Sequence, residues 1–187
     1  MRIPVPLPKA YLLLNHGPTT LVTAMHEKRA NVMAAAWVMA LDIDPPKVIA
    51  VISSDAFTRS LIEKSGEFGL SLPSTDQVDL TYSVGNSSGS DVDKFKTFGI
   101  GTFPGKKVET VLVDGCLGWL ECKLVPEPHV LKTYDLLIAE VVAAWVDDSV
   151  FDPKKGWKFQ KNGPATIHHL TGTTFTCPGR MLEAKKL

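Results

Sequence analysis

The sequence predicts a single domain, residues 1–187, that is mainly β and folds as an antiparallel barrel with short helical insertions. Three observations support this fold class. A chain of 187 residues has the length of one domain, and it contains no repeat or linker that would divide it. Its 13 prolines and 14 glycines are spread widely, which is typical of many short strands joined by turns. Strand-like segments do not alternate regularly with helices, which argues against a parallel doubly wound sheet.

The first half of the chain contains two clear strands and one ambiguous segment. Residues 18–25, PTTLVTAM, are rich in Thr and Val and predict a strand that ends in a polar turn over 26–30. Residues 47–53, KVIAVIS, predict a second strand. Between them, residues 31–43, NVMAAAWVMALDI, are apolar almost throughout. Their alanines favour a helix and their strand-like neighbours favour a strand, so periodicity leaves this segment open.

The hydrophobic period changes after residue 53. Residues 54–66, SDAFTRSLIEKSG, carry an apolar stripe at helical spacing and predict a helix that Ser54 or Asp55 can cap and Gly66 can end. Short helices are predicted at 76–84 and 91–98, on either side of the loop GNSSGS. Further strands are predicted at 67–72, 116–125, 134–145 and 173–176.

The composition excludes several classes of function. The 20 basic and 20 acidic residues cancel, which argues against partners such as nucleic acid or an anionic membrane. No stretch approaches the ~20 apolar residues of a membrane helix, and the proline-interrupted N-terminal segment is interpreted as mature chain rather than signal peptide. Cys116, Cys122 and Cys177 are odd in number and form no C-x-x-C motif. We therefore expect no disulfide framework, no metal site and a cytoplasmic location.

A candidate phosphate site lies where the strand over 47–53 meets the following helix. Ser53 and Ser54 precede the helix, and Thr58 and Arg59 lie in its first turns. A helix N-terminus offers free N–H groups and partial positive charge, so these side chains could complete a site for a phosphate. The alternative is that Ser54 only caps the helix and that Arg59 is solvated.

The segment NVMAAAW, residues 31–37, is a candidate slot for a flat ring. Its small residues allow a planar ligand to approach the backbone, and Met33 and Trp37 could pack against such a ring. The alternative is ordinary core packing, because most apolar stripes belong to the core.

A remote alternative is a serine hydrolase that uses Ser87. The loop over 85–89 matches G-x-S-x-G, and Asp residues and then His168 or His169 follow in the order nucleophile, acid, base. The match is weak because a nucleophile elbow requires a strand before the serine, whereas the preceding VDLTYSV is equally consistent with a helix.

The ordered segments resemble a known family. They are PTTLVTA, NVMAAAW, DPPKVIAVISS and TRSLIEKSGEFGLSLPS, followed by SGSDVDKF, GWLECKLV, YDLLIAEVVAAWVD and IHHLTG. In order and spacing, from about residue 18 to residue 179, they resemble the flavin reductase-like family and, within it, the flavoredoxin-like branch. The resemblance implies an FMN-binding split β-barrel with Greek-key antiparallel strands and short peripheral helices. It also implies a homodimer with one noncovalently bound FMN in each subunit.

The resemblance further implies the cofactor site. The flavin ring and ribityl chain would be lined by Asn31, Val32, Met33, Ala34, Ala35, Ala36 and Trp37. The phosphate would be met by Ser53, Ser54, Thr58 and Arg59, with Lys94 reaching toward the cofactor. The family segment usually reads N-x-M-T-A-S-W or close to it. Ala34 and Ala36 replace hydroxyl residues here, so backbone groups would have to serve the flavin instead.

The implied activity moves hydride or electrons from reduced nicotinamide through FMN to an unidentified external acceptor. The flavin carries this chemistry, so no catalytic acid, base or nucleophile is expected from the protein. An alternative is a flavoredoxin-like electron carrier without an efficient nicotinamide site, since many reductases carry Asp-His where this chain has Asp135-Leu136. In the dimer, residues near His168 and His169, or near Trp157, would cover the cofactor of the other subunit.

Overall fold

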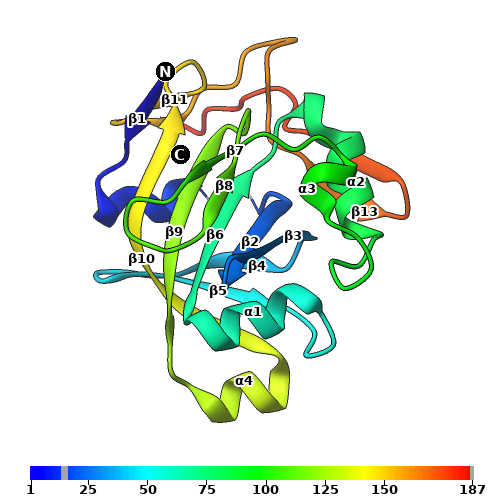
Figure 1. Ribbon diagram of the computed structural model, residues 1–187. Coiled ribbons are helices and arrows are strands. Elements are labelled where there is room, and N and C mark those ends of the chain that lie inside the picture. The colour runs from blue at the N-terminus through cyan, green and yellow to red at the C-terminus, as the bar shows by residue number, and fades with distance from the viewer. Residues whose placement is uncertain (14–16, 186–187) are drawn as a thin grey trace.

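One antiparallel sheet dominates the computed structural model, which describes residues 1–13 and 17–185 (Figure 1). The sheet has eight strands in the order β3-β2-β6-β9-β10-β5-β4, with β1 paired to β10. They are β1 (Arg2–Pro4), β2 (Thr20–His26), β3 (Arg29–Ala35), β4 (Val38–Ile43), β5 (Pro46–Val51), β6 (Glu67–Leu72), β9 (Gly118–Val125) and β10 (Leu136–Asp147). All of these pairs are antiparallel, which confirms the predicted mainly β, antiparallel fold.

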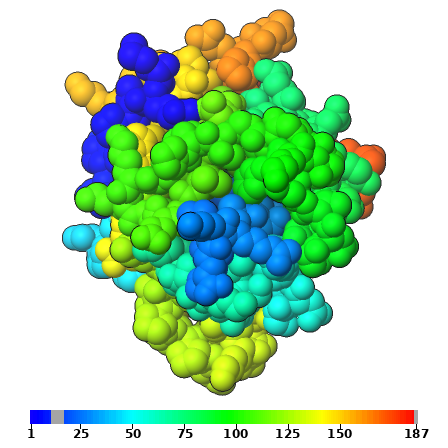
Figure 2. All heavy atoms as spheres, viewed as in Figure 1, coloured from blue at the N-terminus to red at the C-terminus, as the bar shows by residue number. Residues whose placement is uncertain are grey.

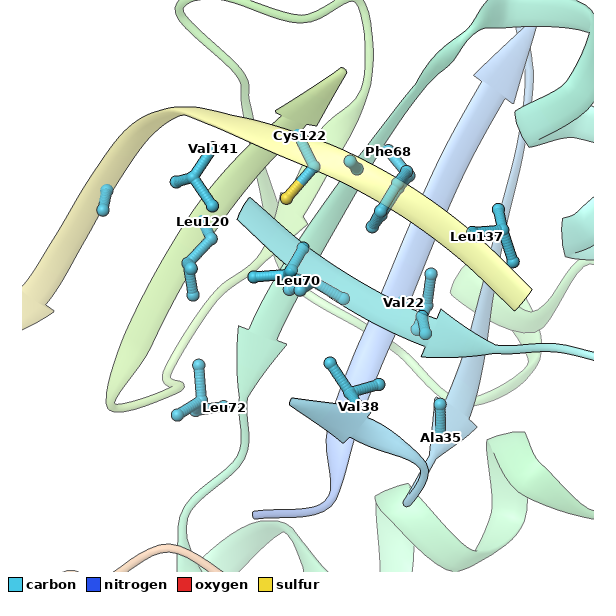
Figure 3. Packing of buried hydrophobic residues seen from close by; sticks show 14 of the residues in the cluster. Val22, Ala35, Val38, Phe68, Leu70, Leu72, Leu120, Cys122, Leu137 and Val141 are labelled. Carbon is cyan, nitrogen blue, oxygen red and sulfur yellow. The ribbon is translucent and has the colours of Figure 1, made fainter. Parts of the chain in front are cut away.

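The two ends of this sheet are consecutive in the sequence. Strands β3 and β4 lie at opposite ends of the strand order, yet only Ala36 and Trp37 separate them along the chain. The ambiguous segment 31–43 therefore contains most of one strand and all of the other. Ala35 and Val38 belong to the same buried cluster, so the sheet curls around one core until its edges meet there (Figure 3). The barrel remains split because β3 and β4 are not hydrogen-bonded neighbours.

The core is built from residues that alternate along the strands, as the period of two requires. Figure 3 shows that side chains from several strands meet in it, with Leu70 and Leu72 of β6 near Leu120 and Cys122 of β9. These four residues are fully buried, with 0% of their surface exposed. The barrel interior is thus filled by apolar side chains, and any ligand must bind outside it.

Helix α1 (Phe57–Ser65) covers one end of the barrel, beside β2 and β3. It ends as predicted at Gly66, whose positive φ of 72° allows its N–H to bond the Ile62 carbonyl at 2.8 Å. The prediction for its start was wrong. The N-cap is Ala56, which provides no side-chain hydrogen bond, and Ser53 Oγ accepts instead from the backbone N–H of Asp55 at 3.3 Å.

The other helices are short and peripheral. A 3-10 turn η2 (Thr75–Gln77), α2 (Val78–Gly85) and α3 (Lys94–Thr97) fall within or beside the two predicted helical segments. Both α2 and α3 contact β3, and Figure 1 shows them grouped at one side with β13. The remaining elements are η1 (Leu7–Leu13), α4 (Pro128–Tyr134), and the hairpins β7 (Thr102–Pro104) with β8 (Val111–Val113), β11 (Phe151–Asp152) with β12 (Gly156–Trp157), and β13 (His168–Thr171) with β14 (Thr174–Thr176). Of these, only β14 was predicted, as the strand over 173–176.

Two structural findings bear on the excluded functions. Among the described residues, no helix is both long and apolar enough to span a membrane, and no three His, Cys, Asp or Glu residues are placed to hold a metal ion. Cys116 and Cys122 are buried, Cys177 is exposed, and all three are free thiols.

Candidate functional site

Two hollows adjoin on the side of the barrel where β3 meets α2. We call them the alanine pocket and the lysine pocket, and each has a volume of about 360 Å³. Gly85 and Asn86, at the end of α2, line both, so the two hollows form one continuous cleft. The alanine pocket is defined by Ala34, Ala35, Ala36, Tyr82, His169 and Phe175, and the lysine pocket by Asn31, Met33, Phe57, Thr58, Gly89 and Lys94.

The alanine pocket has a floor of small side chains and a wall of rings. Its floor is residues 34–36, where β3 ends and the split in the barrel begins. Helix α2 approaches this strand closely, because a Cβ added at Gly85 would lie 3.3 Å from the Ala34 Cβ. The hairpin β13–β14 supplies His169 and Phe175, whose ring centroids are 5.1 Å apart. A shallow apolar floor with aromatic rings beside it suits a flat heteroaromatic group.

The lysine pocket contains a buried cation that lacks a carboxylate partner. Lys94 is only 3% exposed, and its Nζ donates to the carbonyls of Val32 at 2.9 Å and Val84 at 2.7 Å. An ammonium has three N–H donors, so one remains for the pocket. None of the ion pairs among the described residues involves Lys94, and burial lowers its pKa to about 8. A buried charge without a counterion is costly, so Lys94 favours an anionic group beside it, while the exposed Asp55 lines the same pocket.

The start of α1 faces the same pocket. Ala56, Phe57 and Thr58 line it, and no side chain caps the first turn of the helix. The free N–H groups of that turn and the positive end of the helix dipole are therefore available to an anion. The uncapped start of α1 and the buried Lys94 are two independent features that point to the same ligand charge.

A buried hydrogen bond joins the two elements that form the lysine pocket. The side-chain amide of Asn31, on β3, donates to the Thr58 hydroxyl, on α1, at 2.8 Å, and both residues are buried. Gly89 lies against the same amide, and a Cβ at position 89 would overlap the Asn31 side chain. The loop after α2 thus requires glycine here because its backbone closes directly over Asn31.

The structure brings together seven of the residues predicted for the cofactor. Asn31, Met33, Thr58 and Lys94 line the lysine pocket, and Ala34, Ala35 and Ala36 line the alanine pocket. Val32 is fully buried between them and contributes its carbonyl to Lys94. The other four lie elsewhere: Trp37 is 74% exposed, Ser53 and Ser54 are exposed on the turn before α1, and Arg59 lines neither pocket.

The Arg59 side chain, which was predicted to meet the phosphate, is bonded to other parts of the protein. Its guanidinium is buried and donates to the carbonyls of Ile52 at 2.6 Å and Leu131 at 3.1 Å, and to the Glu63 carboxylate at 2.5 Å. These bonds fasten α1 to the end of β5 and to α4. With a fourth bond, from Nη1 to the Asp135 carbonyl at 3.4 Å, they engage four of the five N–H donors of the guanidinium within the protein.

The strand that a serine hydrolase requires before Ser87 is absent. Helix α2 precedes this residue, and Ser87 Oγ donates to the carbonyl of Ser83 at 2.9 Å. The geometry is that of a helix C-terminus rather than a nucleophile elbow, so the hydrolase interpretation loses its structural basis.

Sequence reasoning missed the part of the cleft that comes from distant segments. The loop over 85–89 was interpreted as a simple turn or as a hydrolase motif, yet it lines the lysine pocket. Its two glycines, Gly85 and Gly89, were the available signal, since both sit where a Cβ would crowd β3. Residues near His168 and His169 were expected to cover the cofactor of another subunit, which stays a prediction; within this chain, His169 lines the alanine pocket together with Phe175.

Comparisons with known proteins show the family of the chain. A sequence model described as the flavin reductase like domain matches residues 14–166. An uncharacterized Escherichia coli protein, YddH, is 41% identical over 185 residues, which cover 97% of each chain.

Solved structures give the same result. The FMN-binding domain of a flavin reductase-like enzyme from Shewanella baltica is 41% identical, with a TM-score of 0.95 over 99% of this chain and 98% of that one. Flavoredoxin from Desulfovibrio vulgaris is 25% identical, with a TM-score of 0.78 over 90% of each chain. A split barrel domain from Shewanella frigidimarina, 15% identical, has a TM-score of 0.77 over 95% of this chain and 91% of that one, which supports the fold alone.

Proposed function

The chain belongs to the flavin reductase-like family and has its split-barrel fold, and on this premise we propose that it is an FMN-dependent oxidoreductase. In the proposed reaction, a hydride from a reduced nicotinamide reduces the flavin, and the electrons pass to an external acceptor. The observation that carries the proposal is the placement of Lys94, a buried cation beside the uncapped start of α1, next to a pocket floored by alanines.

The chemistry of FMN matches the two ends of the cleft. FMN has a flat ring at one end and, at the other, a phosphate with a charge of about −2 at neutral pH. The ring suits the alanine pocket, and the phosphate suits the lysine pocket with Lys94 and the N–H groups of α1. The short polar chain between them would pass Gly85 and Asn86, which line both pockets.

The protein's own contribution is binding and orientation. FMN supplies the redox chemistry when it is bound. Ala34 and Ala36 have no polar side-chain atoms, so the backbone of β3 and α2 must satisfy the polar edge of the ring. His169 and Phe175 line the same pocket from the β13–β14 hairpin, where their rings could contact the flavin ring.

We also propose that the active form is a homodimer in a reducing compartment such as the cytoplasm. Strand β4 is an edge of the sheet, and its outward side carries Met39, Leu41 and Ile43, which are 55%, 47% and 53% exposed. Trp37, 74% exposed, extends this stripe toward the alanine pocket. An apolar edge strand invites pairing with another chain, and a second copy would bring its surface to the rim of the flavin cleft. The three free thiols support the reducing compartment.

A second candidate function is an FMN electron carrier with no efficient nicotinamide site. Leu136 favours it, because this residue opens β10 as a half-buried aliphatic side chain paired with Val51, where many reductases carry histidine. The similarity to flavoredoxin favours it as well.

Two measurements on the purified protein test these proposals. First, its visible spectrum and a titration with FMN report whether it binds flavin; a protein that binds no FMN contradicts both functions. Second, NADH and NADPH oxidation is followed at steady state, with free FMN and then with a protein acceptor. Saturable nicotinamide kinetics support the oxidoreductase and reject the carrier. Bound FMN that is reduced only by a protein donor supports the carrier.

A further inference from the structure

A third hollow continues the cleft beyond the lysine pocket. This outer pocket has a volume of about 470 Å³ and is lined by Glu27, Lys28, Arg29, Ser90, Asp91 and Asp93, among others. Gly89 lines both it and the lysine pocket, so the two lie end to end. The cleft would therefore be long enough for a larger ligand if nothing divided these two hollows.

Arg29 forms a bar between them. Its guanidinium carbon lies 4.3 Å from the centroid of the Phe57 ring, and one of its nitrogens donates to the Gly89 carbonyl at 3.2 Å. The bar thus ties together the first residue of β3, the first residue of α1 and the loop after α2. Phe57 and Gly89 line the lysine pocket, while Arg29 lines the outer pocket, so the contact separates the two.

The backbone holds Arg29 in this place. It pairs with His26 at the end of the β2–β3 hairpin, whose turn residues Glu27 and Lys28 have φ values of 48° and 66°. Figure 2 shows this hairpin end as a blue patch on the surface, between green atoms above it and teal atoms below. The cation–π contact and the hydrogen bond add to this backbone constraint.

The charges beyond the bar offer little attraction to a second phosphate. Carboxylates and cations both line the outer pocket: Glu27, Asp91 and Asp93 against Lys28 and Arg29. Asp93 is paired with Lys96 at 3.3 Å, and the Arg29 guanidinium is held by Phe57 and Gly89. The remaining acidic and basic side chains balance, so an anionic group that entered this pocket would meet no excess of positive charge.

We infer that the bar formed by Arg29, Phe57 and Gly89 ends the flavin site and makes the chain selective for a flavin mononucleotide over a flavin dinucleotide. The inference rests on the proposed function and names its cofactor specificity. In FMN the phosphate is the last group, so it fits wholly on the inner side of the bar. In a dinucleotide, a second phosphate and an adenosine follow, and they have to cross the bar into the outer pocket.

Affinities for FMN and FAD, measured by quenching of flavin fluorescence with the flavin-free protein, test this inference. We expect the wild-type chain to prefer FMN by about tenfold or more, and R29A to reduce this preference to about threefold or less by gaining affinity for FAD. F57L removes the other side of the bar without cutting the hydrogen bond to Gly89 and should act in the same direction. K28A is the matched control, since it removes a neighbouring cation of the outer pocket but leaves the bar intact.

The outcomes separate the inference from the proposed function. Equal wild-type affinities for the two flavins overturn the selectivity, and so does a preference that neither R29A nor F57L changes. A wild-type chain that binds neither flavin overturns the proposed function and the inference with it. A preference that falls in R29A and F57L, and not in K28A, supports the bar.

Discussion

The side-chain amide of Asn31 donates a hydrogen bond to the Thr58 hydroxyl at 2.8 Å, between two residues that are 27 positions apart and both buried. Asn31 lies on β3, next to the alanines that would support the flavin ring, and Thr58 lies in the first turn of α1, which would receive the phosphate. This bond fixes the strand and the helix relative to each other. It therefore sets the distance between the two ends of the proposed site.

T58V removes this hydroxyl while preserving the shape of the side chain. The buried Asn31 amide loses its acceptor, so we expect the free energy of unfolding to fall by about 1–3 kcal/mol, measured by urea denaturation. FMN affinity should fall as well, because α1 is no longer fixed to β3. S60A is the control: its hydroxyl bonds the Phe57 carbonyl on the same helix, and Ser60 lines neither pocket. Equal effects of the two variants on FMN affinity would contradict the role given to Thr58.

K94M tests the anion site directly. It keeps a long apolar side chain but removes the charge, so FMN affinity should fall by about ten- to a hundredfold in a fluorescence titration. Riboflavin, which has no phosphate, should bind the variant and the wild type with similar affinity. K96M is the matched control, since Lys96 lies on the same helix but its side chain is 87% exposed. If K94M weakens riboflavin and FMN equally, Lys94 does not bind the phosphate.

Lys94 also predicts the pH dependence of stability in the flavin-free protein. Burial lowers its pKa from 10.5 to about 8 in the folded state. Between these two values the unfolded chain binds more protons at this position than the folded chain, so the Lys94 contribution to stability rises with pH. Below pH 8 both states are protonated and the full cost of the buried charge is present. The unfolding free energy of wild type minus that of K94M should therefore increase from pH 8 to pH 10; a flat or falling difference would contradict this.

Local patterns in the sequence were sufficient for the regular elements and for part of the site. The β-branched run of β5 and the stripe and Gly66 of α1 are short-range signals, and they predicted these elements within a few residues. The segment 31–43 could not be resolved, because its alanines suit a helix and only its place at both edges of one curled sheet makes it two strands. That placement depends on pairings with β2 and β5, which periodicity does not encode.

Contacts between distant segments also explain why the site was only partly predicted from the sequence. Lys94 and Asn31 were implied by the resemblance, and both lie in the lysine pocket; their role in binding the cofactor stays a prediction. The buried Arg59 side chain donates hydrogen bonds to the carbonyls of Ile52 and Leu131. Leu131 belongs to α4, a helix that the sequence did not predict. The destination of a long side chain depends on such distant partners, so sequence order alone could not separate a phosphate ligand from a structural arginine.

Gly89→Ala tests the close approach of the loop to Asn31. The added Cβ overlaps the Asn31 amide, so either the loop or the amide must move, and we expect a loss of about 1–3 kcal/mol in stability. FMN affinity should fall in the same titration, because both groups line the lysine pocket. G179A is a suitable control, since its added Cβ meets no atom within 4 Å. An unchanged FMN affinity in G89A would show that the loop does not hold the phosphate end.

The apolar stripe on β4 leads to a prediction about assembly. L41E places a charge in the middle of the stripe formed by Trp37, Met39, Leu41 and Ile43, on a strand whose outer edge has no partner in the sheet of the described residues. Because Leu41 is 47% exposed, the substitution should leave the folded subunit intact. It should instead make the free energy of dimer association less favourable. We expect sedimentation velocity to show a dimer for the wild type and a monomer for L41E. V92E is the control, since Val92 is 39% exposed but lies in the loop after α2. A wild-type monomer, or an L41E dimer of unchanged affinity, would contradict the assignment of this edge as the dimer interface.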